Sequence, residues 1–287
     1  MISMDERFPG IHHAKTTWTY NIWHLNELEL RSFLWTTAQG MSSWLALKED
    51  EAHEAVSSMN PENMYGDEAD SHFITEVGIY PGPYWSQLSS AVLKDTFTLL
   101  EVFLEESADG ILRRHGSSLV KLSTEDSWSM SECKKFYLDY LGLSVIPEEL
   151  TDLQWIRNKL THLRDELRTK EGKDDFKTKL SRLGVEGDRR PDEEDLPLPH
   201  FEYGRELEFA KSLALSPLEA WRILNLVRAH VEDLMSVLHV VQNGRGTTQM
   251  LVALSAGRPV RNTDRKILVV PHSVESSSAG RLKSSDG

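Results

Sequence analysis

The stretch LQWIRNKLTHLRDELR, from Leu153 to Arg168, decides the fold of this chain. It contains no Gly or Pro, and most of its positions carry good helix formers. Its apolar residues recur at steps of four, three and four, at Ile156, Leu160, Leu163 and Leu167. The spacing predicts an amphipathic helix with one buried stripe.

Three polar residues of different chemistry lie within two turns of this helix: Arg157, Asn158 and His162. At about 100° per residue, Asn158 and His162 share a face, whereas Arg157 falls on the opposite shoulder of the apolar stripe. Cooperation between Arg157 and His162 therefore needs a long reach by the arginine, an irregular helix or a second copy of the helix. We favour the second copy, because a two-fold axis places the same patch on both subunits.

The composition indicates a protein of the cytoplasm. The 287 residues suffice for one large helical domain with appendages or for two domains, and 39% hydrophobic residues with eight Trp support a real core. The single cysteine, Cys133, excludes an intramolecular disulfide and fits a reducing compartment. We expect no signal peptide, no transmembrane helix and no membrane partner.

The net charge of −13 and the pI of about 5.3 count against broad affinity for nucleic acid. They leave room for a local basic site. The quoted stretch carries such a group of cations, which are Arg157, Lys159, Arg164 and Arg168.

Apolar spacing predicts two long helices before this stretch. Residues 22–58 form one helix, or two joined at Gly40, and a second helix runs from about Trp85 to Gly110. Residues 59–83 are a polar crossing rich in Pro and Gly. The expected buried stripes are Ile22, Leu25, Leu28 and Trp35 in the first helix and Trp85, Leu88, Val92, Thr96, Leu99 and Phe103 in the second.

Capping patterns mark the helix boundaries in the middle of the chain. Ser129 to Glu132 is a capping box, and Gly142 ends the helix that it starts. We interpret Ser118 to Leu122 as a loop or a helix extension. Pro147, followed by two glutamates, starts the helix of the quoted stretch, and Gly172 ends it.

Residues 173–204 are charged, rich in Pro and without apolar period, most clearly in GDRRPDEEDLPLP at 187–199. We interpret them as an exposed acidic insertion. A solvated loop is the usual role of such a charge run. The other role is an acidic strip that covers a basic RNA site.

The last long helix is predicted from Ser216-Pro217-Leu218-Glu219 to Gly244. Beyond it, Lys266 to Val270 suggest a short strand, and the Ser- and Gly-rich end suggests a flexible tail. The apolar residues of the helix form a seam suited to antiparallel packing or to a dimer: Leu224, Val227, Val231, Leu234, Leu238 and Val241.

These elements predict an all-α fold, an antiparallel helical bundle of about five core helices. The predicted layout is an N-terminal extension (1–20), a bundle (21–245) with the insertion at 173–204, and a partly disordered C-terminal extension (246–287). The sequence contains no Gly-rich phosphate loop, CxxC or HExxH motif. We therefore expect no metal and no cofactor.

The hexapeptide Arg157-Asn158-Lys159-Leu160-Thr161-His162 resembles the signature of the HEPN superfamily, in which Arg and a polar residue, often Asn, precede a His. Two other Arg–His pairs of similar spacing contain Pro and do not fit a helix. The resemblance covers about residues 20–245 as architecture and about a turn and a half as motif. It implies an all-α bundle that commonly dimerises and brings two motifs together.

Many members of this superfamily are metal-independent RNA endonucleases of toxin–antitoxin, phage-defence and CRISPR systems. RNA supplies its own nucleophile, the 2′-OH, so that cleavage needs a base, an acid and positive charge. His162 can act as base or acid near neutral pH, and Arg157 can grip phosphate oxygens. Asn158 can orient the imidazole or donate to phosphate. The resemblance implies a 2′,3′-cyclic phosphate product.

We therefore expect a metal-independent endoribonuclease of toxin–antitoxin or antiviral-defence type, with its site at a homodimer interface. The expected catalytic residues are Arg157, Asn158 and His162, and the expected RNA-binding residues are Lys159, Arg164 and Arg168. The expected partners are RNA, a second copy, and an antitoxin or sensor that restrains the toxin.

The alternative is a non-catalytic helical module that dimerises or binds a partner through the seam from Leu224 to Val241. The acidic charge balance favours it. In that case Arg157, Lys159 and Arg164 are only the solvated side of an amphipathic helix.

Overall fold

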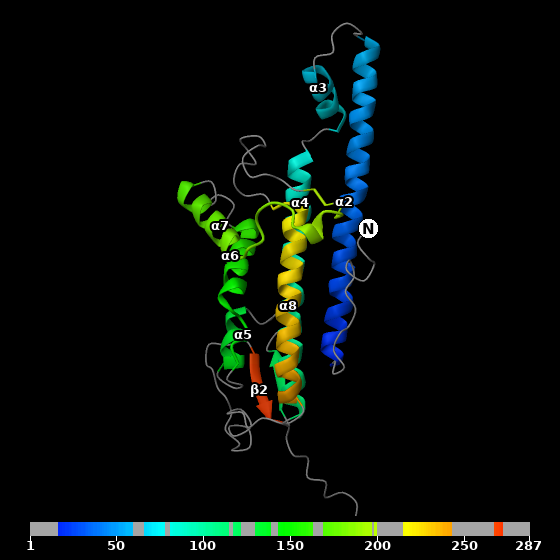
Figure 1. Cartoon of the computed structure of the whole chain (residues 1–287). Coiled ribbons are helices and arrows are strands. Elements are labelled where there is room, and N and C mark those ends of the chain that lie inside the picture. The colour runs from blue at the N-terminus through cyan, green and yellow to red at the C-terminus, as the bar shows by residue number, and fades with distance from the viewer. Residues whose placement is uncertain are drawn as a thin grey trace, which may run out of the picture. The chain divides into compact units, whose positions relative to one another are not determined.

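The structure is a computed structural model that describes residues 17–59, 66–77, 81–114, 117–121, 130–138, 143–162, 169–196, 198–199, 215–242 and 267–271. It is predominantly helical, which confirms the predicted fold class (Figure 1). Its elements are α2 (Trp18–Met59), α3 (Gly66–Val77), α4 (Pro81–Arg114), β1 (Ser117–Lys121), α5 (Met130–Phe136), α6 (Glu148–His162), α7 (Lys170–Arg182), the 3-10 turn η3 (Pro191–Glu193), α8 (Pro217–Gln242) and β2 (Ile267–Pro271).

The chain divides into two compact units, Met1–Phe103 with Ile146–Val237 and Leu104–Val145 with Leu238–Gly287. The second unit contains an antiparallel pair of strands, in which Ser117 of β1 lies opposite Pro271 of β2. The strand at β2 confirms the prediction made for 266–270. Strand β1 corrects the interpretation of 118–122 as a loop or helix extension, because its partner β2 is remote in sequence.

The first unit contains the main core, in which α2 and α8 run antiparallel. Tyr20 of α2 lies at Glu232 of α8, and Trp35 lies at Trp221, with 5.8 Å between the two indole rings. The apolar seam predicted on α8 is buried within its own chain and so serves helix packing rather than a dimer. The side chain of Val241 lies outside the described part, and the buried members of the seam are Leu224, Val227, Val231, Leu234 and Leu238.

Helix α2 is continuous through Gly40, and of the four residues predicted to be buried in it only Trp35 is buried. Leu25 is exposed, and Ile22 and Leu28 are only half-buried. The helix carries apolar residues on two faces, and the face that packs also contains charged groups. The apolar residues that the core buries are Tyr20, Trp23, Leu30, Leu34, Trp35 and Ala38.

Buried ionic side chains join α2 to α8. Glu27 accepts hydrogen bonds from Arg31 on its own helix and from Arg228 of α8, the latter at 2.8 Å. Arg31 Nη1 donates to Asn225 Oδ1 at 2.7 Å, and Arg228 Nη2 lies 3.3 Å from Nδ1 of His24. Loss of one partner from such a group leaves an uncompensated buried charge and costs about 3–5 kcal/mol. The network therefore fixes the register of α2 on α8.

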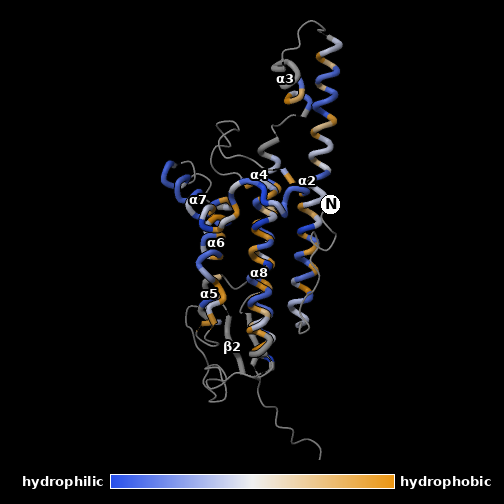
Figure 2. Tube along the Cα trace, viewed as in Figure 1, coloured by the Kyte–Doolittle hydropathy of each residue, from blue (hydrophilic) through white to orange (hydrophobic). Residues whose placement is uncertain are grey.

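Two further helix boundaries differ from prediction. Residues 59–83 are not a plain crossing, since α3 lies within them and packs on α2. Helix α6 begins at Glu148 as predicted, but it does not continue to Gly172. Thr169 has an extended backbone, with φ −74° and ψ 154°, and its Oγ1 accepts the N–H of Gly172 at 3.1 Å. Thr169 thus caps a separate helix, α7, which is hydrophilic over most of its length (Figure 2).

The predicted exposed insertion at 173–204 is folded as far as residue 199. It comprises most of α7 and the turn η3, and its Leu196 and Leu198 join the core cluster that contains Trp221. Residues 200–214 lie outside the described part. The acidic run is therefore anchored to the core at Glu193, although most of its charges are exposed.

Arginine side chains hold this segment in place. Buried Arg222 of α8 donates to both carboxylate oxygens of Glu193, at 2.8 and 2.6 Å. The chain reverses at Gly184 and Gly187, whose φ angles of 63° and 97° are ones that other residues rarely adopt. Arginine also binds main-chain carbonyls along the segment, those of Val185, Gly187 and Asp188 through Arg222 and those of Glu193, Leu196 and Leu198 through Arg189.

Arg222→Met should lower the free energy of unfolding by about 3–5 kcal/mol, because it strands the Glu193 carboxylate and three carbonyls without their donor. Urea unfolding followed by circular dichroism measures this. The control Arg190→Met removes an exposed guanidinium that reaches the carbonyl of Gly184, and it should cost less than about 1 kcal/mol. Equal losses in the two variants would contradict the role of Arg222.

The Glu193 carboxylate should also make stability depend on pH. Burial alone would raise the pKa of Glu193, but hydrogen bonds from Arg222 and from the Arg190 backbone N–H lower it below the ordinary 4.5. The stability that it contributes is therefore complete above the ordinary value and is lost as pH falls through the lower, folded value. The urea midpoints of the wild type and of Glu193→Gln should differ at about pH 6 and approach each other as pH falls below the ordinary 4.5. A difference that is constant over this range would contradict the prediction.

Candidate functional site

Helix α6 carries the polar residues that the sequence singled out. Arg157, Asn158 and Lys159 lie in its C-terminal half and are half-buried. His162 is the last residue of α6, and its side chain lies outside the described part, as do Arg164 and Arg168. The structure thus places the motif at a helix end and describes the surroundings of its first half.

Arg157 is held by its own chain. Its Nη1 donates to Asn158 Oδ1 at 2.8 Å, and its Nη2 donates to Glu101 Oε2 of α4 at 3.1 Å. The guanidinium carbon lies 5.7 Å from the ring centre of Phe97. Its Nε is buried and has no hydrogen-bond partner among the described residues. The guanidinium therefore rests between α4 and α6, and its Nε–H is not used in a hydrogen bond to the described residues.

Glu101 is the residue at this site that the sequence did not reveal. Burial raises its pKa, and the positive charge of Arg157 opposes that shift. Phe97 and Glu101 are four residues apart on α4, so both meet the same guanidinium. This spacing was visible in the sequence, but its partner lies 56 residues away. Arg157 therefore pairs with Glu101 and is half-buried, and it is not part of a purely solvated helix face.

The side-chain amide of Asn158 has an oxygen acceptor and an NH2 donor, and its oxygen is already hydrogen-bonded. Its oxygen accepts from Arg157, so an interaction with an imidazole or a phosphate would use its N–H groups. Asn158 and His162 are four residues apart on a continuous helix and so occupy the same face by position. The arrangement links Arg157 to the face of His162 through Asn158, although the two residues are not stacked on each other.

The predicted RNA-binding residue Lys159 lies beside an aromatic ring. Its Nζ is 5.5 Å from the ring centre of Trp155, and Lys179 of α7 lies 5.2 Å from the same ring. Lys179 and Arg182 both bind the buried carboxylate of Asp152, at 2.8 and 2.7 Å. These contacts tie α7 to α6 and concentrate cations on the side of α6 that carries Trp155.

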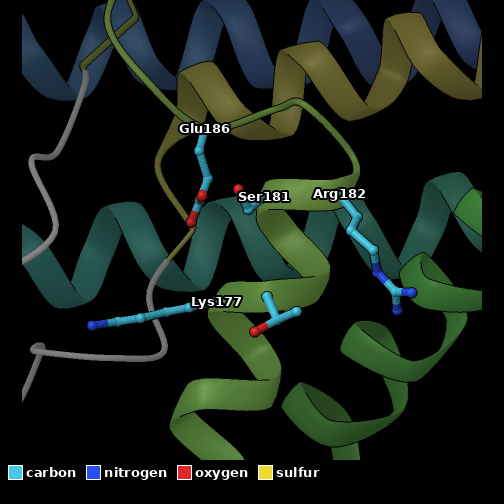
Figure 3. Close-up of a pocket in the computed structure, with 5 residues that line it drawn as sticks. Lys177, Ser181, Arg182 and Glu186 are labelled. Carbon is cyan, nitrogen blue, oxygen red and sulfur yellow. The ribbon is translucent and has the colours of Figure 1, made fainter.

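A separate hollow of about 590 Å³ lies along α7 (Figure 3). Its labelled side chains diverge, with Lys177 and Arg182 pointing to opposite sides and Glu186 lying near Ser181. Burial raises the pKa of Glu186, while Lys177 and the Ser181 hydroxyl lower it. Arg182 is already bound to Asp152 and Glu148. The hollow contains none of the predicted site residues and no convergent set of free polar groups among those it exposes.

Within the described ranges, no three His, Cys, Asp or Glu side chains are grouped so as to hold a metal ion. Among the helices of that same part, none has the length and apolar character needed to cross a membrane.

Comparison of the chain with protein-family models, with curated proteins and with solved structures found no match in any of the three. The functional interpretation therefore rests on the residues of α6 and their surroundings.

Proposed function

We propose that this protein is a metal-independent RNA endonuclease of toxin–antitoxin or phage-defence type that acts in the cytoplasm. The proposal rests on one arrangement: a guanidinium held between two helices, joined through Asn158 to the face of a helix that ends in His162. His162 is the proposed general base or acid, Arg157 the phosphate ligand and Asn158 the residue that aligns them.

The proposed reaction breaks one P–O bond and needs no cofactor. A base takes the proton of the RNA 2′-OH, and the 2′-oxygen attacks the adjacent phosphorus. The bond to the 5′-oxygen breaks, and an acid returns a proton to that oxygen. The products are a 2′,3′-cyclic phosphate and a 5′-hydroxyl. Because one imidazole cannot be base and acid at once, a second copy of α6 would supply the other group.

The cations near the motif would bind the RNA backbone. They are the proposed RNA ligands Lys159, Arg164 and Arg168, the first of which lies with Lys179 at Trp155. A net charge of −13 makes non-specific RNA binding unfavourable, so the site must act locally. A toxin of this kind needs restraint, and we propose an antitoxin or sensor protein as the partner.

A second candidate function is a non-catalytic helical module that dimerises or binds a partner. The ion pair between Arg157 and Glu101 favours it, because a guanidinium satisfied within its own chain is also an ordinary structural feature. In this case Arg157 would stabilise the contact of α4 with α6 and would bind no phosphate.

His162→Ala should abolish RNA cleavage and leave the fold intact. Expression of both proteins in a bacterial host, with growth and total RNA integrity read together, measures this. The matched control is His53→Ala, which removes an exposed histidine of α2 and should keep the wild-type effect. Fragmented RNA at equal protein level in His162→Ala would contradict the proposed catalytic role.

Glu101→Gln should strengthen RNA binding by roughly tenfold, because the carboxylate that competes with phosphate for Arg157 becomes neutral. Fluorescence anisotropy of a labelled single-stranded RNA measures this in a His162→Ala background, where cleavage does not interfere. Glu106→Gln, an exposed change on the same helix, is the control. Unchanged or weaker binding in Glu101→Gln would instead support the structural role of the ion pair.

A further inference from the structure

The outer face of α2 exposes a row of large apolar side chains. The exposed fractions are 78% for Trp18, 55% for Leu25, 48% for Phe33, 38% for Trp44 and 55% for Leu47. Apolar residues recur along α2 well beyond the part that α8 covers (Figure 2). Single exposed apolar residues are common on proteins, but five large ones aligned on one face of a helix indicate an interaction surface.

The row follows one face of the helix over more than two-thirds of its length. Its members are separated by steps of three and four, so they line up at 3.6 residues per turn. This face is opposite the one that packs against α8. In order, the positions are Trp18, Ile22, Leu25, Glu29, Phe33, Thr36, Gly40, Trp44 and Leu47, of which Ile22 is half-buried and the rest are exposed.

Gly40 lies in this row, although no neighbouring atom of the described chain requires a glycine there. A Cβ added there would meet nothing within 4 Å, and its backbone has no positive φ. Glycine inside a helix costs about 1 kcal/mol relative to alanine. What glycine offers is a notch, which lets another side chain or helix approach the backbone closely.

The row is self-complementary about Phe33. The apolar positions before Phe33 lie at nearly the same distances from it as the positions after it. Two antiparallel copies that cross at Phe33 therefore place a large residue opposite the notch and aromatic residues opposite aliphatic ones. The pairs are Trp18 with Leu47, Ile22 with Trp44, and Leu25 with Gly40.

We propose that two copies of this chain pair through the outer faces of their α2 helices, antiparallel, with Phe33 on the two-fold axis and Leu25 seated at Gly40 of the second copy. An isologous interface of this kind requires one patch that fits itself, which the row provides.

The area and charge of the row suit this partner. With about 150–250 Å² for a fully exposed large side chain, the five exposed side chains present roughly 400–700 Å² per copy. Complete burial of this area in both copies amounts to roughly 800–1,400 Å², which includes the lower end of the range for specific interfaces. Glu29 is the one ionisable residue in the row, and it comes opposite Thr36 and Thr37. The acidic residues Glu49 to Glu51 follow Leu47 and lie beyond the paired length.

This surface is independent of the chemistry proposed for α6. Arg157 binds Glu101 of α4, and none of the residues of the row takes part in that contact. The residues of the row are therefore distinct from those proposed for cleavage, and the test of pairing through α2 does not require RNA.

Disulfide trapping tests the geometry directly. The native Cys133 is buried, so an added surface cysteine is the reactive one. Phe33→Cys should form covalent dimers rapidly on mild oxidation, because residues on the axis meet their own copies. The control Val237→Cys, at an exposed apolar position of α8, should form few. Leu25→Cys and Gly40→Cys should each cross-link poorly alone and well when mixed. Equal cross-linking of Phe33→Cys and Val237→Cys would overturn the proposal.

Gly40→Leu should stabilise the monomer and weaken the dimer. It should raise the thermal unfolding midpoint of the monomer, since leucine is the better helix former, while it fills the notch and raises the dimer dissociation constant at least about tenfold. Phe33→Asp should weaken the dimer by as much, and Val237→Asp should not. Sedimentation velocity and light scattering at about 0.15 M salt, where exposed charges are screened, measure this. A wild type that stays monomeric to about 100 µM, or variants that dimerise as the wild type does, would overturn the proposal.

Discussion

The carboxylate of Glu27 is the group on which the first unit depends. It binds two buried guanidinium groups, Arg31 on its own helix and Arg228 on α8, and Glu232 supplies the second negative charge through its ion pair with Arg228 at 2.9 Å. Burial lowers the pKa of Arg31, and the negative charge of Glu27 opposes that shift. A buried ion pair of this kind adds little net stability. It does select one register of α2 against α8, because any other alignment leaves a buried charge without its partner. The apolar contacts along α2 and α8, including Trp35 with Trp221, depend on that alignment.

A second arginine organises the segment between α7 and α8 in the same manner. Arg222 binds Glu193 and three backbone carbonyls, so that an acidic, Pro-rich run with little apolar content becomes part of the core. Arg157 likewise joins α4 to α6, but it has fewer partners and an unused Nε. This difference in the number of hydrogen bonds matters for function. A fully bonded guanidinium such as Arg222 has no capacity for a ligand. Arg157 has an unpartnered Nε and a single carboxylate partner, and in the proposed function a phosphate replaces that carboxylate.

Local chemistry explains which features the sequence predicted. The starts of α6 and α8 followed from Pro147 with its glutamates and from Ser216 with Glu219, whose reciprocal hydrogen bonds, at 2.7 and 3.1 Å, form a capping box. The packed face of α2 did not follow, because Glu27 and Arg31 look solvent-facing until Arg228 is placed beside them. The anchoring of Glu193 and the role of Glu101 could not be predicted for the same reason, since each depends on an arginine that is remote along the chain. Sequence reasoning placed the motif of α6 on a helix, but it could not identify the partner of Arg157.

The antiparallel contact of α2 with α8 has a consequence for synthesis of the chain on the ribosome. Glu27 and Arg228 are separated by 201 positions, and the other contacts of this helix pair are similarly remote. At about 5–20 residues per second, α2 leaves the ribosome some 10–40 seconds before the helix that neutralises its inner face. During that interval the ionic part of α2 that α8 covers and the apolar outer face are both exposed. A nascent α2 is therefore a natural substrate for chaperones that bind exposed apolar helices, and assembly of the first unit is completed only after α8 has emerged.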